Sequence, residues 1–321
     1  AEEAAKSSFD ETRESIDKTT GGHVPKRQLE ELVTRAALDF DTFYDRRRYE
    51  PNGAGQTGSL LVLSTDGKGI VMHEQDLREQ TRKAAEKRTQ KMGTRLSKGE
   101  KRNSKRMATV ATVYTIEPFK RAPEDIVAET GCRLKKEKRP RPEQKRVWAS
   151  IEKTPEEVIE DAFSEAYHRD PTHKKQWVAL VDGDRTQIDI LLKKAKEKGL
   201  VLTIIVDIIH VIEYLWKAGR VFHPESGIVL ENWVRHRLKG VLRGKAGLIA
   251  GGMRRSATFH ELSDKEREPV EKCATYLLNK KPYLHYDRYL SQGFPIATGV
   301  IEGACRHLVK DRMEVTGAKW R

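Results

Sequence analysis

Three aspartates follow short apolar segments at the points where buried strands are expected to end. They are Asp66, Asp182 and Asp207, which come after the segments SLLVLST, QWVALV and LVLTIIV. A carboxylate at the end of a buried strand is costly unless a cation or hydrogen bonds compensate its charge. One such aspartate is explained equally well as the cap of the following helix. Three in one sheet favour a metal-binding carboxylate cluster, because ligands of open α/β sheets bind at the carboxyl ends of the strands.

A fourth carboxylate, Glu302, lies early in a predicted final helix over residues 298–313. Its neighbours include Gly299 and Gly303, and residues without a side chain let another backbone or a ligand come close. As an alternative, Glu302 forms an ordinary surface ion pair with Arg306, four residues further along the helix. The flanking glycines favour the functional interpretation.

A carboxylate cluster suits Mg²⁺, which prefers hard oxygen ligands in octahedral geometry. Two such ions, about 3.5–4 Å apart, activate the attacking oxygen and stabilise the leaving oxygen in phosphoryl transfer. His210 follows Asp207 by three residues and lies in an apolar helix start. It is either a core histidine bonded to backbone or a side chain that orients a phosphate or a neighbouring carboxylate.

The elements that must position these residues follow from the hydrophobic pattern. Residues 176–181, 187–198 and 200–206 predict a strand, a helix and a strand, which is parallel α/β topology. Residues 107–116 alternate in the manner of a further strand. The segment TPEEVIEDAF predicts a helix that has Thr154 as its N-cap.

Four regions are expected along the chain. Residues 1–58 form a helical N-terminal segment, interpreted as the end of a truncated DNA-binding region. Residues 59–224 form the first part of an α/β core, and residues 291–321 add its last helix. Between them, residues 225–290 carry several amphipathic helical patterns and almost no strand signal, so they predict a helical insertion.

The composition excludes several classes of protein. Among 321 residues, 37% are hydrophobic and 34% charged. No apolar run approaches the about 18 residues of a membrane span, so no membrane partner is expected. The 3 cysteines are far apart and form no CxxC pair, which argues against a disulfide framework or a zinc knuckle. No secretory segment is visible, so a cytoplasmic, nucleoid-associated location is expected.

Positive charge is concentrated in two stretches. The net charge is +13, to which residues 78–106 contribute 12 − 3 = +9 and residues 133–146 contribute 8 − 2 = +6. Such concentration is expected of a polyanion-binding protein, although solvated lysine-rich loops or a membrane surface would also account for it. The basic side chains expected to contact DNA are Arg82, Lys83, Lys87, Arg88, Lys101, Arg102, Lys105, Arg106, Arg306, Lys310 and Arg312.

The order of these motifs resembles that of the DDE transposases with an RNase H-like core. Asp66-Gly, Asp182-Gly and Asp207-Ile-Ile-His210 precede the helical stretch, which is followed by Gly-Val-Ile-Glu302. Within these transposases the chain most resembles bacterial insertion-sequence transposases of the ISKra type, which are related to Mutator-like elements. The resemblance covers about residues 59–320.

This resemblance implies an α/β fold with an RNase H-like mixed sheet, flanking helices and an all-helical insertion before the last catalytic helix. It implies that Asp66, Asp182 and Glu302 are catalytic and hold two Mg²⁺ or Mn²⁺ ions. Asp207 and His210 would be auxiliary. Asp182, Asp184 and Asp207 compete for the second position, and Asp182 is preferred because the fourth strand lies next to the first in such cores.

The function expected on these grounds is that of a transposase catalytic domain. It would cleave DNA strands at the ends of an insertion sequence and join them to target DNA, as a homodimer or higher oligomer. Two alternatives stay open. One is a non-catalytic DNA-binding remnant or regulator of a transposase. The other is an RNase H-like nuclease that only hydrolyses.

Overall fold

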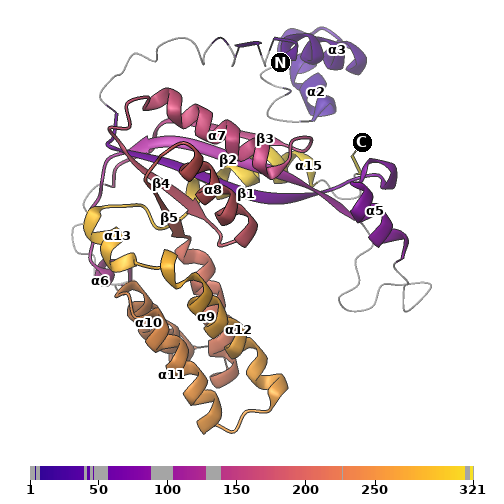
Figure 1. Cartoon of the computed structure of the whole chain (residues 1–321). Helices are drawn as coiled ribbons and strands as arrows, with labels where there is room; N and C mark the ends of the chain where they lie inside the picture. Colours follow the sequence, from indigo (N-terminus) through magenta and orange to yellow (C-terminus); the bar gives the residue numbers. More distant parts are fainter. Residues whose placement is uncertain are drawn as a thin grey trace. The chain divides into compact units, whose positions relative to one another are not determined.

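The computed structural model describes residues 4, 8–39, 42–43, 46, 57–87, 104–127, 139–225, 227–314 and 319–320 (Figure 1). The chain divides into two compact units, which are described separately. Unit 1 comprises residues 1–55, 69–106 and 306–321, and unit 2 comprises residues 56–68 and 107–305. All four carboxylates singled out above belong to unit 2.

Unit 2 is built on a mixed sheet of five strands in the order β3-β2-β1-β4-β5. β1 is parallel to β4, β4 is parallel to β5, and β3 is antiparallel to β2. The expected mixed α/β class is therefore confirmed. The strands are β1 Leu60–Val71, β2 Lys105–Ile116, β3 Glu143–Ser150, β4 Gln176–Val181 and β5 Leu202–Val206.

Two strands differ from the sequence expectation. The first strand was expected to end at Asp66, but β1 continues to Val71, so Asp66 lies inside it. The glycines at 67 and 69 do not end β1, which has β2 and β4 as hydrogen-bonded neighbours. β3 falls in a stretch without a strand pattern of its own, because Glu143, Lys145 and their neighbours leave it partly exposed.

The central strands are buried because helices cover them. β4 is buried from Trp177 to Val181, as its continuous apolar run requires. Helices α7 (Pro155–Arg169) and α8 (Arg185–Glu197) lie side by side against the sheet (Figure 1). Thr154 is the N-cap of α7, as predicted, and forms a capping box with Glu157.

A bundle of helices follows β5. It consists of α9 (Ile208–Phe222), α10 (Ile228–Leu242), α11 (Ala246–Phe259) and α12 (Asp264–Lys280), which lie side by side in Figure 1. α9 and α10 approach closely at Gly219, where an added Cβ would come within 2.8 Å of Leu230. A single 3-10 turn (Lys281–Tyr283) and α13 (Tyr286–Gln292) lead back toward the sheet. The described residues between 225 and 290 contain helices and no strand.

The last helical segment is divided into three pieces where one continuous helix was expected. α14 (Gly299–Ala304) passes into a π-helical turn (Cys305–Lys310) and then into α15 (Asp311–Met313). A π-helical turn shifts the side chains that follow it around the helix axis, and such turns are frequent at functional sites.

Unit 1 contains short helices and the ends of two strands. Its described helices include α2 (Phe9–Thr20), α3 (Lys26–Ala37), α5 (Glu79–Glu86) and α15, together with the 3-10 turn Glu74–Asp76. Trp320 pairs with Met72 as an isolated parallel bridge, and its indole N–H donates to the Met313 carbonyl. Among the described helices of both units, none has the length and apolarity that crossing a bilayer requires.

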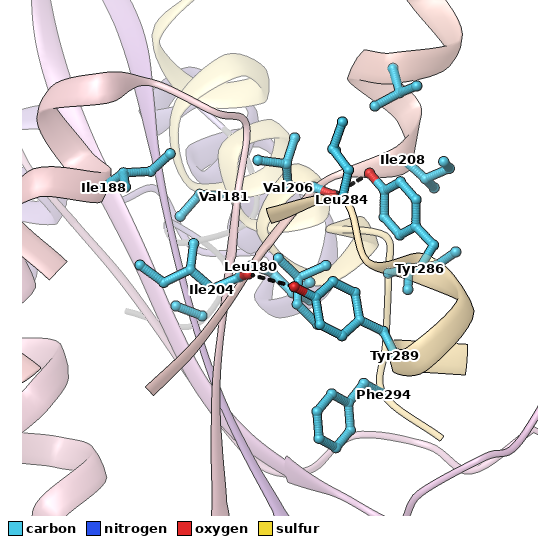
Figure 2. Packing of buried hydrophobic residues seen from close by; sticks show 14 of the residues in the cluster. Leu180, Val181, Ile188, Ile204, Val206, Ile208, Leu284, Tyr286, Tyr289 and Phe294 are labelled. Carbon is cyan, nitrogen blue, oxygen red and sulfur yellow. Dashed lines mark hydrogen bonds between the residues drawn. The ribbon is translucent and has the colours of Figure 1, made fainter. Parts of the chain in front are cut away.

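Two tyrosines of α13 cover the outer edge of the sheet (Figure 2). Edge strands expose unpaired backbone groups unless another element covers them. The Tyr286 hydroxyl donates to the Val206 carbonyl at 2.6 Å, and the Tyr289 hydroxyl donates to the Ile204 carbonyl at 3.4 Å. α13 therefore closes β5 at the end from which α9 departs.

We expect Tyr286→Phe to lower the free energy of unfolding by about 1–3 kcal/mol, because a buried carbonyl loses its donor. Tyr289→Phe is the matched control, and its longer bond predicts a smaller loss. Urea unfolding of both variants measures the difference. Equal stability of Tyr286→Phe and the unsubstituted protein would show that α13 does not hold the sheet edge in this way.

Candidate active site

The strand register sets three aspartates in one row across the sheet. Ser64 on β1 is paired with Leu180 on β4, so a step of two residues brings Asp66 level with Asp182. Val181 is paired with Val206 on β5, so the next step brings Asp182 level with Asp207. Neighbouring strands lie about 4.7–4.9 Å apart. Asp66, Asp182 and Asp207 are therefore neighbours across three adjacent strands, with Asp66 inside β1 and the other two directly after β4 and β5.

The hydrogen bonds of Asp207 show that it stabilises the fold. Its side chain is 0% exposed. One carboxylate oxygen accepts from the Ile209 N–H at 2.8 Å, as an N-cap of α9. The other accepts from the Thr298 hydroxyl and from the Thr298 N–H. Asp207 thus joins the end of β5 to the residue that precedes α14.

Asp182 is half-buried, and one of its oxygens has no donor among the residues that the structure describes. Its Oδ1 accepts from the Asp184 N–H at 2.7 Å. Asp184 in turn is the N-cap of α8 and accepts from the Gln187 N–H. Between them Gly183 has a φ of +97°, which only glycine adopts without strain. Within the described ranges, Asp182 and Asp184 each accept a single hydrogen bond through one carboxylate oxygen, whereas both oxygens of the third competitor, Asp207, accept hydrogen bonds.

Asp66 is anchored to the last helical segment. Its Oδ1 accepts from the Gly67 N–H at 2.7 Å, and the Cys305 thiol lies 3.3 Å from its Oδ2 as a donor. Burial, followed by the nearby Asp66 charge, raises the pKa of Cys305 to about 12. Cys305 is therefore a neutral thiol that donates to Asp66.

Glu302 lies between two anchors, Thr298 and Cys305. Its backbone N–H donates to the Thr298 carbonyl at 3.1 Å, and its side chain is exposed. Desolvation raises the pKa of Glu302, and the charges of Asp207 and Asp66 add to this effect. Glu302 is thus within electrostatic reach of the row of aspartates.

Like charges also act on Asp182. Desolvation is the largest cause that raises its pKa, and the Asp66 charge raises it further. A positive charge on His210 lowers the pKa of both Asp182 and Glu302. His210 is half-buried and has no hydrogen-bond partner among the described residues, so the alternative of a core histidine bonded to backbone gains no support.

No lysine or arginine side chain of the described residues neutralises this group of acids. None of Asp66, Asp182, Asp207 and Glu302 has a lysine or arginine ion-pair partner there. The described part of the chain contains no set of three or more His, Cys, Asp or Glu side chains placed closely enough to hold a metal ion. The donors that are present are carboxylate oxygens, the ligand type that Mg²⁺ prefers.

The basic residues expected to contact DNA lie in unit 1, and Arg88, Lys101 and Arg102 fall outside the described residues. Several of the others are paired with acids. Lys83 pairs with Glu79 at 2.6 Å and Lys105 with Glu314 at 3.1 Å. Further contacts, some of them longer, join Arg82 to Glu86, Arg306 to Asp311 and Arg106 to the Asp76 carbonyl. The alternative interpretation of Glu302, an ion pair with Arg306, does not occur among the described residues.

The sequence pattern did not indicate Thr298, Cys305 or Tyr276 as part of this site. The Tyr276 hydroxyl donates to the Asp182 carbonyl at 3.1 Å and lies 3.1 Å from the Cβ that Gly183 lacks. Cys305 follows Glu302 by three residues, which places both on one side of a helix and was a usable signal. Thr298 and Tyr276 reach the site through tertiary contacts that no local spacing shows.

Comparisons of the chain with known protein families, with curated proteins and with solved structures found no match.

We expect Thr298→Val to lower the free energy of unfolding by about 1.5–3 kcal/mol, because the buried Asp207 carboxylate loses a hydroxyl donor. Thr298→Ser keeps the hydroxyl and should retain most of the stability. Urea denaturation of the two variants measures the difference. If Val and Ser at this position are equally stable, the Asp207–Thr298 contact does not hold the last segment in place.

We expect Asp182→Asn to be more stable than the unsubstituted protein at pH 7 in EDTA. The raised pKa means that the folded state binds this proton more readily than the unfolded state. Protonation of Asp182 therefore stabilises the folded state fully below the unfolded pKa of about 3.9. This stabilisation is lost as the pH rises through the folded pKa. The gain from Asn should accordingly vanish near pH 3.5.

Thermal unfolding across this pH range measures the effect. The matched control is Asp189→Asn, which removes an exposed charge on α8 paired with Arg185 at 3.7 Å. An Asp182→Asn variant that follows the control at every pH would contradict the electrostatic description of the site.

Proposed function

We propose that this chain is the catalytic domain of a DDE transposase with an RNase H-like core, which cleaves and joins DNA strands in a divalent-metal-dependent reaction. The observation that carries the proposal is that Asp66 and Asp182 lie side by side on adjacent parallel strands. The segment that carries Glu302 is hydrogen-bonded to Asp66 through Cys305 and to Asp207 through Thr298. Proteins that transfer phosphodiesters need little more than positioning and charge stabilisation.

The sheet supports the fold part of the proposal. An order of β3-β2-β1-β4-β5, in which β1, β4 and β5 are parallel and β3 is antiparallel to β2, is the arrangement expected of an RNase H-like core. The helices α10, α11 and α12 fall within residues 225–290, where the helical insertion is expected. The order of the motifs along the chain supports the family part.

The roles of the carboxylates follow from their hydrogen bonds. Asp66, Asp182 and Glu302 would hold Mg²⁺ or Mn²⁺, because each is a hard donor and none is committed to an ion pair. When bound, such ions activate the attacking oxygen and stabilise the leaving oxygen. Asp207 does not serve as a ligand in this scheme, since it is fully buried and accepts three protein hydrogen bonds, whereas Asp66 and Asp182 are only half-buried.

The remaining residues position the reactants. Thr298 and Cys305 fix the helix that carries Glu302, one on each side of it. His210 lies where its charge acts on Asp182 and Glu302, so it orients the scissile phosphate or one of these carboxylates. Basic side chains of unit 1 that pair with no acid among the described residues, such as Lys87 and Lys310, contribute phosphate contacts that do not depend on sequence.

We expect Asp66→Asn to lower the rate of strand cleavage by more than about a hundredfold, since even outer-shell partners of a metal ligand contribute about 10- to 100-fold. DNA affinity should persist or tighten, because a negative charge that faces phosphate is removed. Labelled DNA that carries the element's own ends, incubated with Mg²⁺ or Mn²⁺, measures cleavage and strand transfer in one experiment.

Asp189→Asn is the control, because it removes an aspartate charge from the surface of the same unit. Full cleavage by Asp66→Asn would overturn the catalytic assignment. Cleavage without joining would favour the nuclease, and binding of the ends without any cleavage by the unsubstituted protein would favour the non-catalytic remnant.

A further inference from the structure

A hollow lies on α9, the helix that starts directly after the aspartate row. It is lined by Glu213, Trp216, Lys217 and Arg220. These residues are spaced by three and four, so they share one face of the helix. α9 leaves the end of β5 and enters the helical bundle (Figure 1), so this face begins at the candidate active site and leads away from it.

The distance along the helix suits a short piece of nucleic acid. His210, at the near end, acts electrostatically on Asp182 and Glu302. Ten residues separate it from Arg220, which is about 15 Å at 1.5 Å per residue. That length corresponds to about four nucleotides at a spacing of 3.4 Å.

Trp216 supplies an aromatic surface beside the hollow. Its side chain is half-buried and packs against the hydrophobic core, which fixes the ring in place. Its indole N–H has no hydrogen-bond partner in the described part of the chain. A fixed aromatic ring at an open surface is the platform on which an unpaired base stacks.

Two cations flank this ring. Arg220 is exposed and makes no ion pair among the described residues. The Lys217 ammonium lies 5.3 Å from the centre of the Tyr214 ring and 3.9 Å from a Glu213 oxygen. An arginine without an acid partner is suited to bind phosphate through two N–H groups. Glu213 is the one acid of the hollow, and it lies nearest to the active site.

We propose that this face of α9 is a subsite for a single strand of DNA that enters or leaves the active site. An unpaired base stacks on Trp216, and the adjoining phosphates bind Arg220 and Lys217. The inference rests on the proposed function and deepens it, because it assigns DNA binding to α9 of unit 2 in addition to the basic residues of unit 1.

The chemistry favours a strand with unpaired bases over a duplex. Stacking requires an exposed base face, and alanine substitution of such aromatic platforms costs about 1–3 kcal/mol per base. A blunt duplex offers phosphates and no free base. The contribution of Trp216 should therefore depend on unpaired nucleotides, whereas that of Arg220 should appear as salt dependence.

The test is fluorescence anisotropy of the full chain in EDTA with two labelled duplexes, one blunt and one with a five-nucleotide overhang. We expect Trp216→Leu to weaken binding of the overhang DNA about tenfold, which is 1.4 kcal/mol, and to leave the blunt duplex unchanged. Trp216→Phe keeps a ring and should lose less. Arg220→Gln should weaken binding and reduce the salt slope by about one.

Two further variants complete the experiment. Arg255→Gln, the matched control, removes an exposed arginine on α11 that likewise has no ion pair among the described residues, and should change the affinity less than twofold. Glu213→Gln should tighten binding, because a charge that repels phosphate is removed. Circular dichroism confirms that each variant is folded.

The proposal is overturned if Trp216→Leu and Arg220→Gln weaken overhang binding no more than Arg255→Gln does. It is also overturned if Trp216→Leu weakens both duplexes equally. No cleavage is measured in EDTA, so these outcomes are independent of whether the chain cuts DNA. If the Trp216 and Arg220 variants lose overhang binding but the unsubstituted protein never cleaves DNA, the subsite is supported and only the proposed catalysis is contradicted.

Discussion

The register of three parallel strands is the constraint on which the site depends. Because β1, β4 and β5 are paired without a shift, Asp66, Asp182 and Asp207 lie level with one another. A slip of one residue in either pairing would turn one of these side chains to the opposite face of the sheet. β4 is buried from Trp177 to Val181 and β5 from Ile204 to Val206, so both strands lie in the core directly before their aspartates.

The three aspartates of this row differ in burial and in hydrogen bonding, which limits the repulsion between their charges. Asp207 is fully buried, and donors from two segments compensate its charge. Asp182 and Asp66 are only half-buried, and burial, with repulsion from the Asp66 charge added, raises the pKa of Asp182. The segment that carries Glu302 is held by Thr298 before it and by Cys305 after it. In the proposed scheme, Asp207 stabilises the fold, whereas Asp66 and Asp182 serve the reaction.

Much of this arrangement could be predicted from local patterns. The apolar runs before Asp182 and Asp207 indicated buried parallel strands, and Thr154 marked the start of α7 correctly. The extension of β1 beyond Asp66 could not be predicted, because two glycines resemble a turn unless the pairing with β2 is known. Nor could the division of the last helix at Cys305 or the role of α13, since hydrogen bonds from Tyr286 and Tyr289 join residues about eighty positions apart.

The central claim is that Asp66 and Asp182 together hold a divalent cation. Crystals grown with Mn²⁺ and a short DNA duplex would test it directly through the anomalous scattering of manganese. The account predicts an anomalous peak between these two carboxylates, with oxygen distances of about 2.0–2.3 Å. A well-ordered complex in which manganese binds elsewhere, with no ion shared by Asp66 and Asp182, would contradict it.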